Sequence, residues 1–305
     1  MGWPSTLTYR EIVALKVPRS VEILAHYGDV ETAAELFAKD PALAGDPGAL
    51  AAAAKSGHEA FVRLLLRHQP ALARRVAVAA RTRELTELLF ENGMDPNLTD
   101  WLGIAPLHRF AAQGEVEKAA IFLDHGADLE ACDLEIRSTP LGHAAKSGRT
   151  RMAEFLLRRG ARPDFPADPP WARPLAWATR RGHEGVVSLL TDYLRSGTLP
   201  ARRPEHYDSL ANDLIQACAS GEEVAMRRIA EHFNLARQLN WDRPAREVQI
   251  ARLRRLIETR LAVPSGQGTG EWSLPLEAAR HLIARSEGYR GWPQLVAEIG
   301  GPSPN

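Results

Sequence analysis

The chain has 305 residues, 45% hydrophobic and 25% charged, which is typical of a globular protein able to bury one or two cores. Basic and acidic residues balance at 38 each, so zero formal net charge excludes a general attraction to nucleic acid or membranes. The only cysteines, Cys132 and Cys218, exclude a disulfide scaffold and suit a reducing cytosol. We interpret both as packing residues. No apolar run has the length of a signal peptide or a membrane span, so we expect a cytoplasmic protein.

In chain order, residues 1–19 are a lead-in, and a repeated pattern then begins. The first copy, "VEILAHYGDVETAAELFAKDP", is half-matched around Gly28, and "GALAAAAKSGHEAFVRLLLRHQP" follows it. A degenerate copy, "VAVAARTRELTELLFENGMDPN", has Arg81 in place of the turn glycine. Three close copies occupy 105–127, 139–161 and 172–194, and their prolines are spaced by 34 residues (140 minus 106, and 174 minus 140). A fixed period of this length indicates a stack of like units.

Each unit reads as two short helices. In "PLGHAAKSG", Pro140 suits a first helical turn, and Gly148 suits the left-handed residue that ends a helix. Leu141, Ala144 and Ala145 form one thin apolar stripe at helical spacing. The segment "RTRMAEFLLRRG" has a second apolar stripe at helical spacing, formed by larger side chains. A lone helix pair cannot bury its stripe, so neighbouring units must stack into an all-α solenoid.

The repeats resemble the ankyrin repeat family. The resemblance rests on the Pro-Leu turns, the alanine pair, the turn glycine and the Gly-Ala pairs, which are found at Pro106-Leu107-His108, Pro140-Leu141, Ala144-Ala145, Gly148, 126–127 and 160–161. It covers about 20–194, as five to six units, and is clearest at 100–194. It implies an arc with a concave groove, projecting turns and a default role in binding another protein. It also implies that His108 has a structural role. The spacing departs from the usual 33 by one residue in each of the turns 128–139 and 162–173.

The rest of the chain reads as a second part. Residues 195–209 are polar and contain proline, which indicates a linker, and 210–305 read as a helical C-terminal domain. Its end, with Gly288-Tyr289 and Trp292-Pro293-Gln294-Leu295, resembles a helical tail found on bacterial ankyrin-type proteins. Such a domain could cap the open end of the solenoid. The glycine-rich stretch 266–270 reads as a flexible loop.

The groove face follows from helix geometry. Positions two, five and six after the leucine of each first helix point away from the apolar stripe. Arg109, His143 and Trp177 share one such slot in successive units and should form a column across the groove floor. With the projecting turns, the predicted groove is basic and aromatic: Trp101, Leu102, Arg109, Gln113, Glu135, Arg137, His143, Lys146, Trp171, Trp177, Arg180 and Arg181.

Two functions are compatible with this face. The first is a non-catalytic protein that holds a protein partner with an acidic surface, since Trp and Arg dominate binding hot spots. The alternative is a small-molecule site, for an anionic or aromatic ligand, walled by the groove and the C-terminal helices. It could be an isomerase or cyclase type of enzyme, in which neighbouring cations keep His143 neutral as a base beside Glu135 and Arg109. No metal motif, cofactor motif or nucleic-acid motif is apparent, so we expect no metal, cofactor or nucleic-acid partner.

Overall fold

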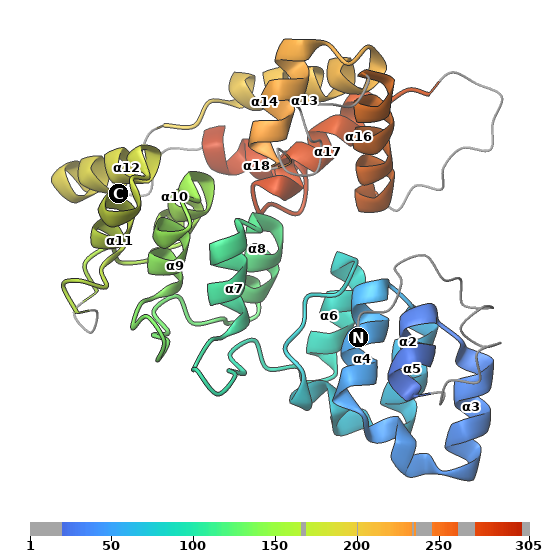
Figure 1. The fold of residues 1–305 in the computed structure, drawn as a ribbon. Coiled ribbons are helices and arrows are strands. Elements are labelled where there is room, and N and C mark those ends of the chain that lie inside the picture. The colour runs from blue at the N-terminus through green and yellow to red at the C-terminus, as the bar shows by residue number, and fades with distance from the viewer. Residues whose placement is uncertain are drawn as a thin grey trace. The chain divides into compact units, whose positions relative to one another are not determined.

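The computed structural model describes residues 20–165, 169–199, 201–233, 235, 246–261 and 272–300. All regular secondary structure in these ranges is helical, which confirms the predicted all-α class (Figure 1). The chain divides into two compact units: unit 1 combines residues 1–107 with 121–128, and unit 2 combines 108–120 with 129–305. The predicted lead-in and the glycine-rich loop at 266–270 lie outside the described residues.

Unit 1 is built from short helices that follow the predicted copies. They are α2 (Val21–Tyr27), α3 (Val30–Lys39), the 3-10 helix η1 (Pro41–Gly45), α4 (Pro47–Ser56), α5 (Glu59–His68), η2 (Pro70–Arg75) and α6 (Arg83–Glu91). Polar caps fix several starts: Asp29 accepts a hydrogen bond from the Thr32 backbone at 3.1 Å, and Thr82 accepts one from Leu85 at 3.2 Å. Helices α7 (Pro106–Gln113) and α8 (Val116–Asp124) contribute to both units.

The degenerate copy around Arg81 forms only its second helix, α6. Residues 76–80 are not helical, so the expectation of a complete helix pair was wrong at this copy. At the end of this segment, the Ala80 backbone donates to the Thr86 hydroxyl at 3.0 Å, and the next residue, Arg81, donates to the Ala54 carbonyl at 2.9 Å. The second bond joins this stretch to the preceding copy.

Unit 2 contains the two clearest helix pairs and all the C-terminal helices. The pairs are α9 (Pro140–Lys146) with α10 (Thr150–Arg158) and α11 (Pro174–Arg181) with α12 (Glu184–Ser196). Within each pair the two helices pack together. Between pairs, first helix packs on first helix (α9 on α11) and second on second (α10 on α12). This is the stacking that the 34-residue period predicts.

The glycine that follows α9 also makes room for the next unit. Gly148 has a φ of +67°, and a Cβ there would lie 2.7 Å from the His183 ring. His183 uses this space to reach back, with Nε2 3.1 Å from the Lys146 carbonyl oxygen. Glycine at position 148 therefore both ends the helix and allows the next unit to approach closely.

The C-terminal helices have a core of their own. They are α13 (Pro204–Ala219), α14 (Glu223–His232), α16 (Arg246–Leu261), α17 (Leu276–Ser286) and α18 (Trp292–Gly300). Leu214, Ile229, Ile283 and Leu295 are fully buried at their centre. Because α12 extends to Ser196 and α13 begins at Pro204, only 197–203 of the expected linker lies between helices.

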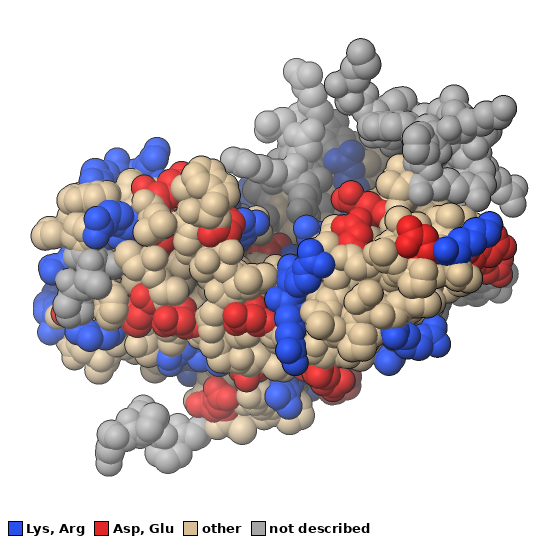
Figure 2. All heavy atoms as spheres, turned by 90° about the horizontal axis from the view of Figure 1, so that it is seen from below, with Lys and Arg blue, Asp and Glu red and all other residues tan. Residues whose placement is uncertain are grey.

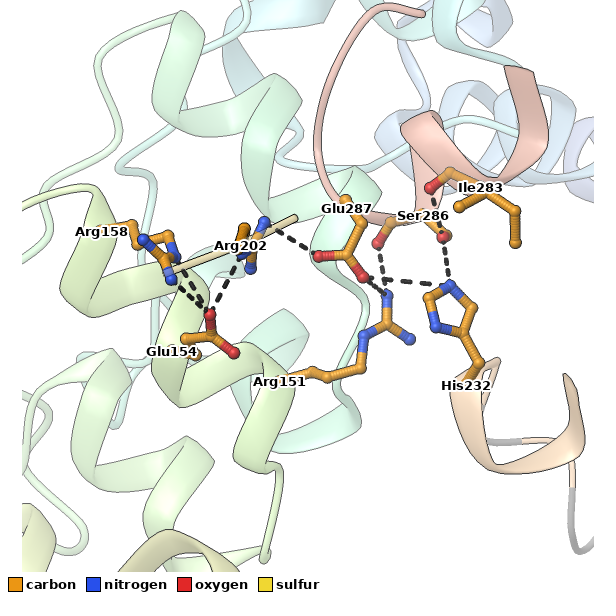
Figure 3. Close-up of polar contacts among 8 residues, drawn as sticks. All are labelled: Arg151, Glu154, Arg158, Arg202, His232, Ile283, Ser286 and Glu287. Atoms are coloured by element: carbon orange, nitrogen blue, oxygen red, sulfur yellow. Dashed lines mark hydrogen bonds and ion pairs between the residues drawn. The ribbon is translucent and has the colours of Figure 1, made fainter. Parts of the chain in front are cut away.

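Ion pairs of a buried glutamate join the end of α17 to the second helix α10 (Figure 3). Glu287, only 5% exposed, pairs with Arg151 of α10 at 2.8 Å and with Arg202 at 3.0 Å. Arg202 also pairs with Glu154 of α10 at 3.1 Å. Burial alone would raise the pKa of Glu154, but Arg202 and Arg158 hold it below its usual value. The C-terminal domain is therefore anchored to the repeats within unit 2.

Charge is not segregated on the face drawn in Figure 2, where basic and acidic side chains alternate, in keeping with zero net charge. Among the described helices, none has the length and apolar composition needed to cross a bilayer. Cys218 is buried, which raises the pKa of its thiol to about 12, as expected for a packing residue. Cys132 is exposed, so the same interpretation was wrong for it, because it lies in the turn before α9 rather than in the core.

Candidate functional site

Basic and aromatic side chains gather on the first-helix face of unit 2. Lys146, at the end of α9, places Nζ 5.0 Å from the Trp177 ring centre, and the Arg180 guanidinium lies 4.2 Å from the same centre. The Trp171 ring meets Trp177 edge-on, with centroids 6.4 Å apart. Arg180 also donates a hydrogen bond to the Trp171 carbonyl oxygen. We call Lys146, Trp171, Trp177 and Arg180 the Trp177 cluster.

The repeat geometry explains why these four residues meet. Trp177 and Arg180 are three apart on α11 and so share a helix face. Lys146 reaches the same ring because α9 packs directly on α11. Trp171 lies in the turn that precedes α11 and is 48% exposed. The cluster is thus an aromatic platform at the surface, held by cation–π contacts that are worth about 0.5–1 kcal/mol each at exposed sites.

Positive charge around the cluster is not neutralised within the part of the chain that the structure describes. No described carboxylate forms an ion pair with Lys146, Arg180 or the exposed Arg137. Arg137 precedes α9 with a φ of 50°, a left-handed conformation that is uncommon for a residue other than glycine. Glu135 is exposed in the same turn. The face therefore offers cations and large aromatic rings to the solvent.

His143 lies in a different environment, against a buried carboxylate. Its Nε2 is 2.9 Å from Asp133 Oδ2, and its ring meets that of His108 edge-on at 5.0 Å. Asp133 also accepts backbone hydrogen bonds from Glu135 at 2.8 Å, Ile136 at 2.7 Å and Ser138 at 3.2 Å. Asp133 thus shapes the turn before α9 and fixes the His143 ring at the same time.

Burial and hydrogen bonding set the charge states of this pair. Burial alone would raise the pKa of Asp133, but the Ile136 backbone N–H, His143 and the Ser138 backbone N–H together hold it below its usual value. Burial lowers the pKa of His143, and Asp133 opposes only part of this effect. Lys146 lowers it further, as a smaller contribution. The expected neutral imidazole is therefore explained mainly by burial, and only in small part by neighbouring cations.

The repeats are similar in sequence to known proteins. Residues 75–167 match the family described as ankyrin repeats (3 copies). A cyclin-dependent kinase inhibitor 2A from Monodelphis domestica is 34% identical over 120 residues, which cover 39% of this chain and 68% of that relative. A cyclin-dependent kinase 4 inhibitor B from Bos taurus is 32% identical over 115 residues, or 37% of this chain and 86% of the relative.

The chain belongs to the ankyrin repeat family. Ankyrin repeats are modules for binding other proteins, which gives this chain a role in protein–protein interaction. Within the repeats, His108 is fully buried and its Nε2 lies 2.9 Å from the Ala131 carbonyl oxygen. This bond ties α7 to the following turn, as the family resemblance implied.

The predicted groove residues fall into three groups. Four form the Trp177 cluster, and Arg137 and Arg181 are exposed on the same unit. His143 does not join the cluster and instead contacts Asp133 and His108. The other predicted residues are not joined to the cluster by the contacts described above: Trp101 and Leu102, which belong to unit 1, and Arg109, Gln113 and Glu135 of unit 2.

Sequence reasoning missed Asp133 and the exposed Leu134. A signal for Asp133 exists in the preceding ankyrin unit, where Asp100 accepts backbone hydrogen bonds from Leu102 and Ile104 at 2.9 and 3.0 Å. An aspartate thus opens the turn before two successive Pro-Leu steps and shapes both turns. The residue after it projects to the solvent in both turns, as Trp101 and Leu134.

The contacts of the C-terminal helices bear on the enzyme hypothesis. That hypothesis needed them to wall the face formed by the first helices. The ion pairs of Glu287 and the pairing of Arg285 with Glu117 instead join α17 to α8 and α10, which are second helices. His143 also has Asp133, not Glu135, as its carboxylate partner. These contacts bring together no two of the three proposed catalytic residues, His143, Glu135 and Arg109.

Proposed function

We propose that the ankyrin repeats of unit 2 hold a protein partner through the Trp177 cluster, and that the partner presents an acidic segment with a large apolar side chain. The observation that carries this proposal is the pairing of two unneutralised cations, Lys146 and Arg180, with the Trp177 ring beside an exposed Trp171. Trp and Arg are the residues most enriched at binding hot spots. The relatives named as kinase inhibitors also act on another protein.

Two buried donors beside the cluster support an acidic partner. Arg173 Nε and Trp177 Nε1 are buried, and neither has a hydrogen-bond acceptor among the described residues. An unsatisfied buried donor costs about 1–3 kcal/mol, so an acceptor brought by a ligand is favoured. Both residues are only half-buried as a whole, so each side chain also reaches the surface on which a carboxylate would bind. We further infer that the protein works in a reducing compartment such as the cytoplasm, because its two cysteines, Cys132 and Cys218, form no disulfide.

The partner class can be tested without knowing the partner. Random peptides displayed on phage are selected against the full chain, and the enriched peptides are synthesised and titrated. We expect enrichment of Asp and Glu next to Leu, Phe or Trp. Enrichment of neutral or basic peptides would contradict the proposed partner chemistry.

Charge reversal then locates the site. Lys146→Glu and Arg180→Glu should each weaken binding of the selected peptide at least about tenfold, because a hot-spot contact is worth about 2 kcal/mol or more. The matched control is Arg252→Glu, which reverses an exposed arginine on α16 that has no described carboxylate partner. If Arg252→Glu weakens binding as much as the other two, the attraction is general and the Trp177 cluster is not the site.

A further inference from the structure

Two histidines and an aspartate converge beneath the first-helix face of unit 2. His108 comes from α7, Asp133 from the following turn and His143 from α9, and one ligand atom from each lies within 4.8 Å of the others. His143 Nε2 and Asp133 Oδ2 are already 2.9 Å apart. The two imidazole rings meet at 5.0 Å with 72° between their planes, so their edges converge.

The carboxylate of Asp133 carries a buried negative charge with no cationic partner. Its residue is 1% exposed, and its described partners are three backbone N–H groups and the His143 imidazole. A buried charge is costly unless it is paired or coordinates a metal. No lysine or arginine forms an ion pair with it in the described residues. A bound cation would supply the missing positive charge.

We propose that His108, Asp133 and His143 form a binding site for a transition-metal dication, with Zn²⁺ as the ion that best fits the donor set. Imidazole nitrogen together with one carboxylate oxygen suits zinc, whereas calcium and magnesium prefer all-oxygen sites. Three protein ligands leave the fourth tetrahedral position for water, and the His143 side chain keeps a small exposed edge, 11%, through which an ion and its water can enter.

The rearrangement that binding requires is small. Bonds of about 2.0–2.1 Å to a tetrahedral zinc place ligand atoms about 3.3–3.5 Å apart. The pair formed by His143 and Asp133 is already closer than this, so the main movement is an approach of His108 by at most about 1.5 Å from the 4.8 Å limit. Coordination through Nε2 of His108 would replace its hydrogen bond to the Ala131 carbonyl. The ion would then link α7, the turn and α9, and bind independently of the protein partner.

The proposal is tested on the full chain after treatment with a chelator. Co²⁺ is titrated first, because a tetrahedral Co²⁺ site absorbs visible light, and Zn²⁺ is then added to displace it while heat is recorded. We expect one ion per chain with a dissociation constant in the micromolar range or tighter, and a thermal midpoint that rises with zinc concentration. Absence of a tetrahedral spectrum and of binding heat at about 100 µM metal would overturn the proposal.

Two variants separate this site from adventitious binding by surface histidines. His143→Gln keeps a side-chain N–H for Asp133 but removes a metal ligand, and should weaken binding by at least tenfold. His206→Gln removes an exposed histidine of α13 and should bind as the wild type does. Circular dichroism checks that both variants fold. Equal affinity in wild type and His143→Gln, or loss in His206→Gln, would place the metal elsewhere. If His143→Gln unfolds, Asp133→Asn provides the second test of the same prediction.

Discussion

Removing the charge of Glu287 should destabilise unit 2 strongly. In Glu287→Gln the side chain keeps its shape, but Arg202, whose side chain is 8% exposed, loses its partner at 3.0 Å, and Arg151 loses its partner at 2.8 Å. Breaking a buried pair by removing one partner costs about 3–5 kcal/mol, because a buried charge is left uncompensated. Arg202 keeps Glu154 at 3.1 Å, so we expect a loss about 1 kcal/mol smaller than this, about 2–4 kcal/mol.

Urea unfolding followed by circular dichroism and tryptophan fluorescence measures this change in the free energy of unfolding. The control is Glu223→Gln, which breaks an exposed ion pair with Arg227 on α14, where the side chains are 78% and 76% exposed. Surface pairs contribute about 0–1 kcal/mol, so the control should stay close to wild type. If Glu287→Gln lowers the free energy of unfolding by less than about 0.5 kcal/mol, the Glu287 pairs contribute no more than a surface pair, and the predicted cost of unpaired buried arginines is wrong.

Three further predictions concern the core, acid stability and the thiols. Met152→Ala removes a fully buried side chain and should cost about 2–5 kcal/mol in urea unfolding, a result that a loss under 1 kcal/mol would contradict. The lowered folded-state pKa of Glu154 stabilises the fold above the unfolded value near 4.5, and this contribution is lost as the pH falls through the folded pKa. Unfolding of Glu154→Gln should therefore depend less on pH below 4.5 than wild type does; parallel curves would contradict this. Cys132 should react with a thiol reagent at once at pH 8, and Cys218, with a pKa of about 12, only after unfolding.

The repeat architecture was predictable because its signals are local. Pro140 and Pro174 begin first helices, and Gly148 and Gly182 are the left-handed residues that end them. These residues act through their own backbone conformation, which does not depend on distant contacts. The missing helix at 76–80 shows the limit of a pattern: apolar spacing persists there, but Ala80 donates to Thr86 and the next residue, Arg81, donates to Ala54.

The candidate site was only partly predictable from the sequence. Lys146, Trp177 and Arg180 were predicted to share one face from helix geometry, and Trp171 from its place in a projecting turn; these four residues do lie in contact. His143 shares their slot in the repeat, but a long-range bond to Asp133, ten residues earlier, withdraws it. The anchoring of the C-terminal helices joins residues as far apart as Glu117 and Arg285, 168 positions in the chain. Pairings of that kind depend on tertiary packing and leave no periodic signal.

Hydrogen exchange of the full chain, with and without a selected acidic peptide, tests whether the Trp177 cluster is the binding site. We expect bound peptide to slow amide exchange in the turn at 133–139, at the end of α9 and across 171–182, which together carry Arg137 and the Trp177 cluster. Exchange in α14 and α16 should not change. Protection confined to unit 1 or to the C-terminal helices, with none at 171–182, would contradict the proposed site.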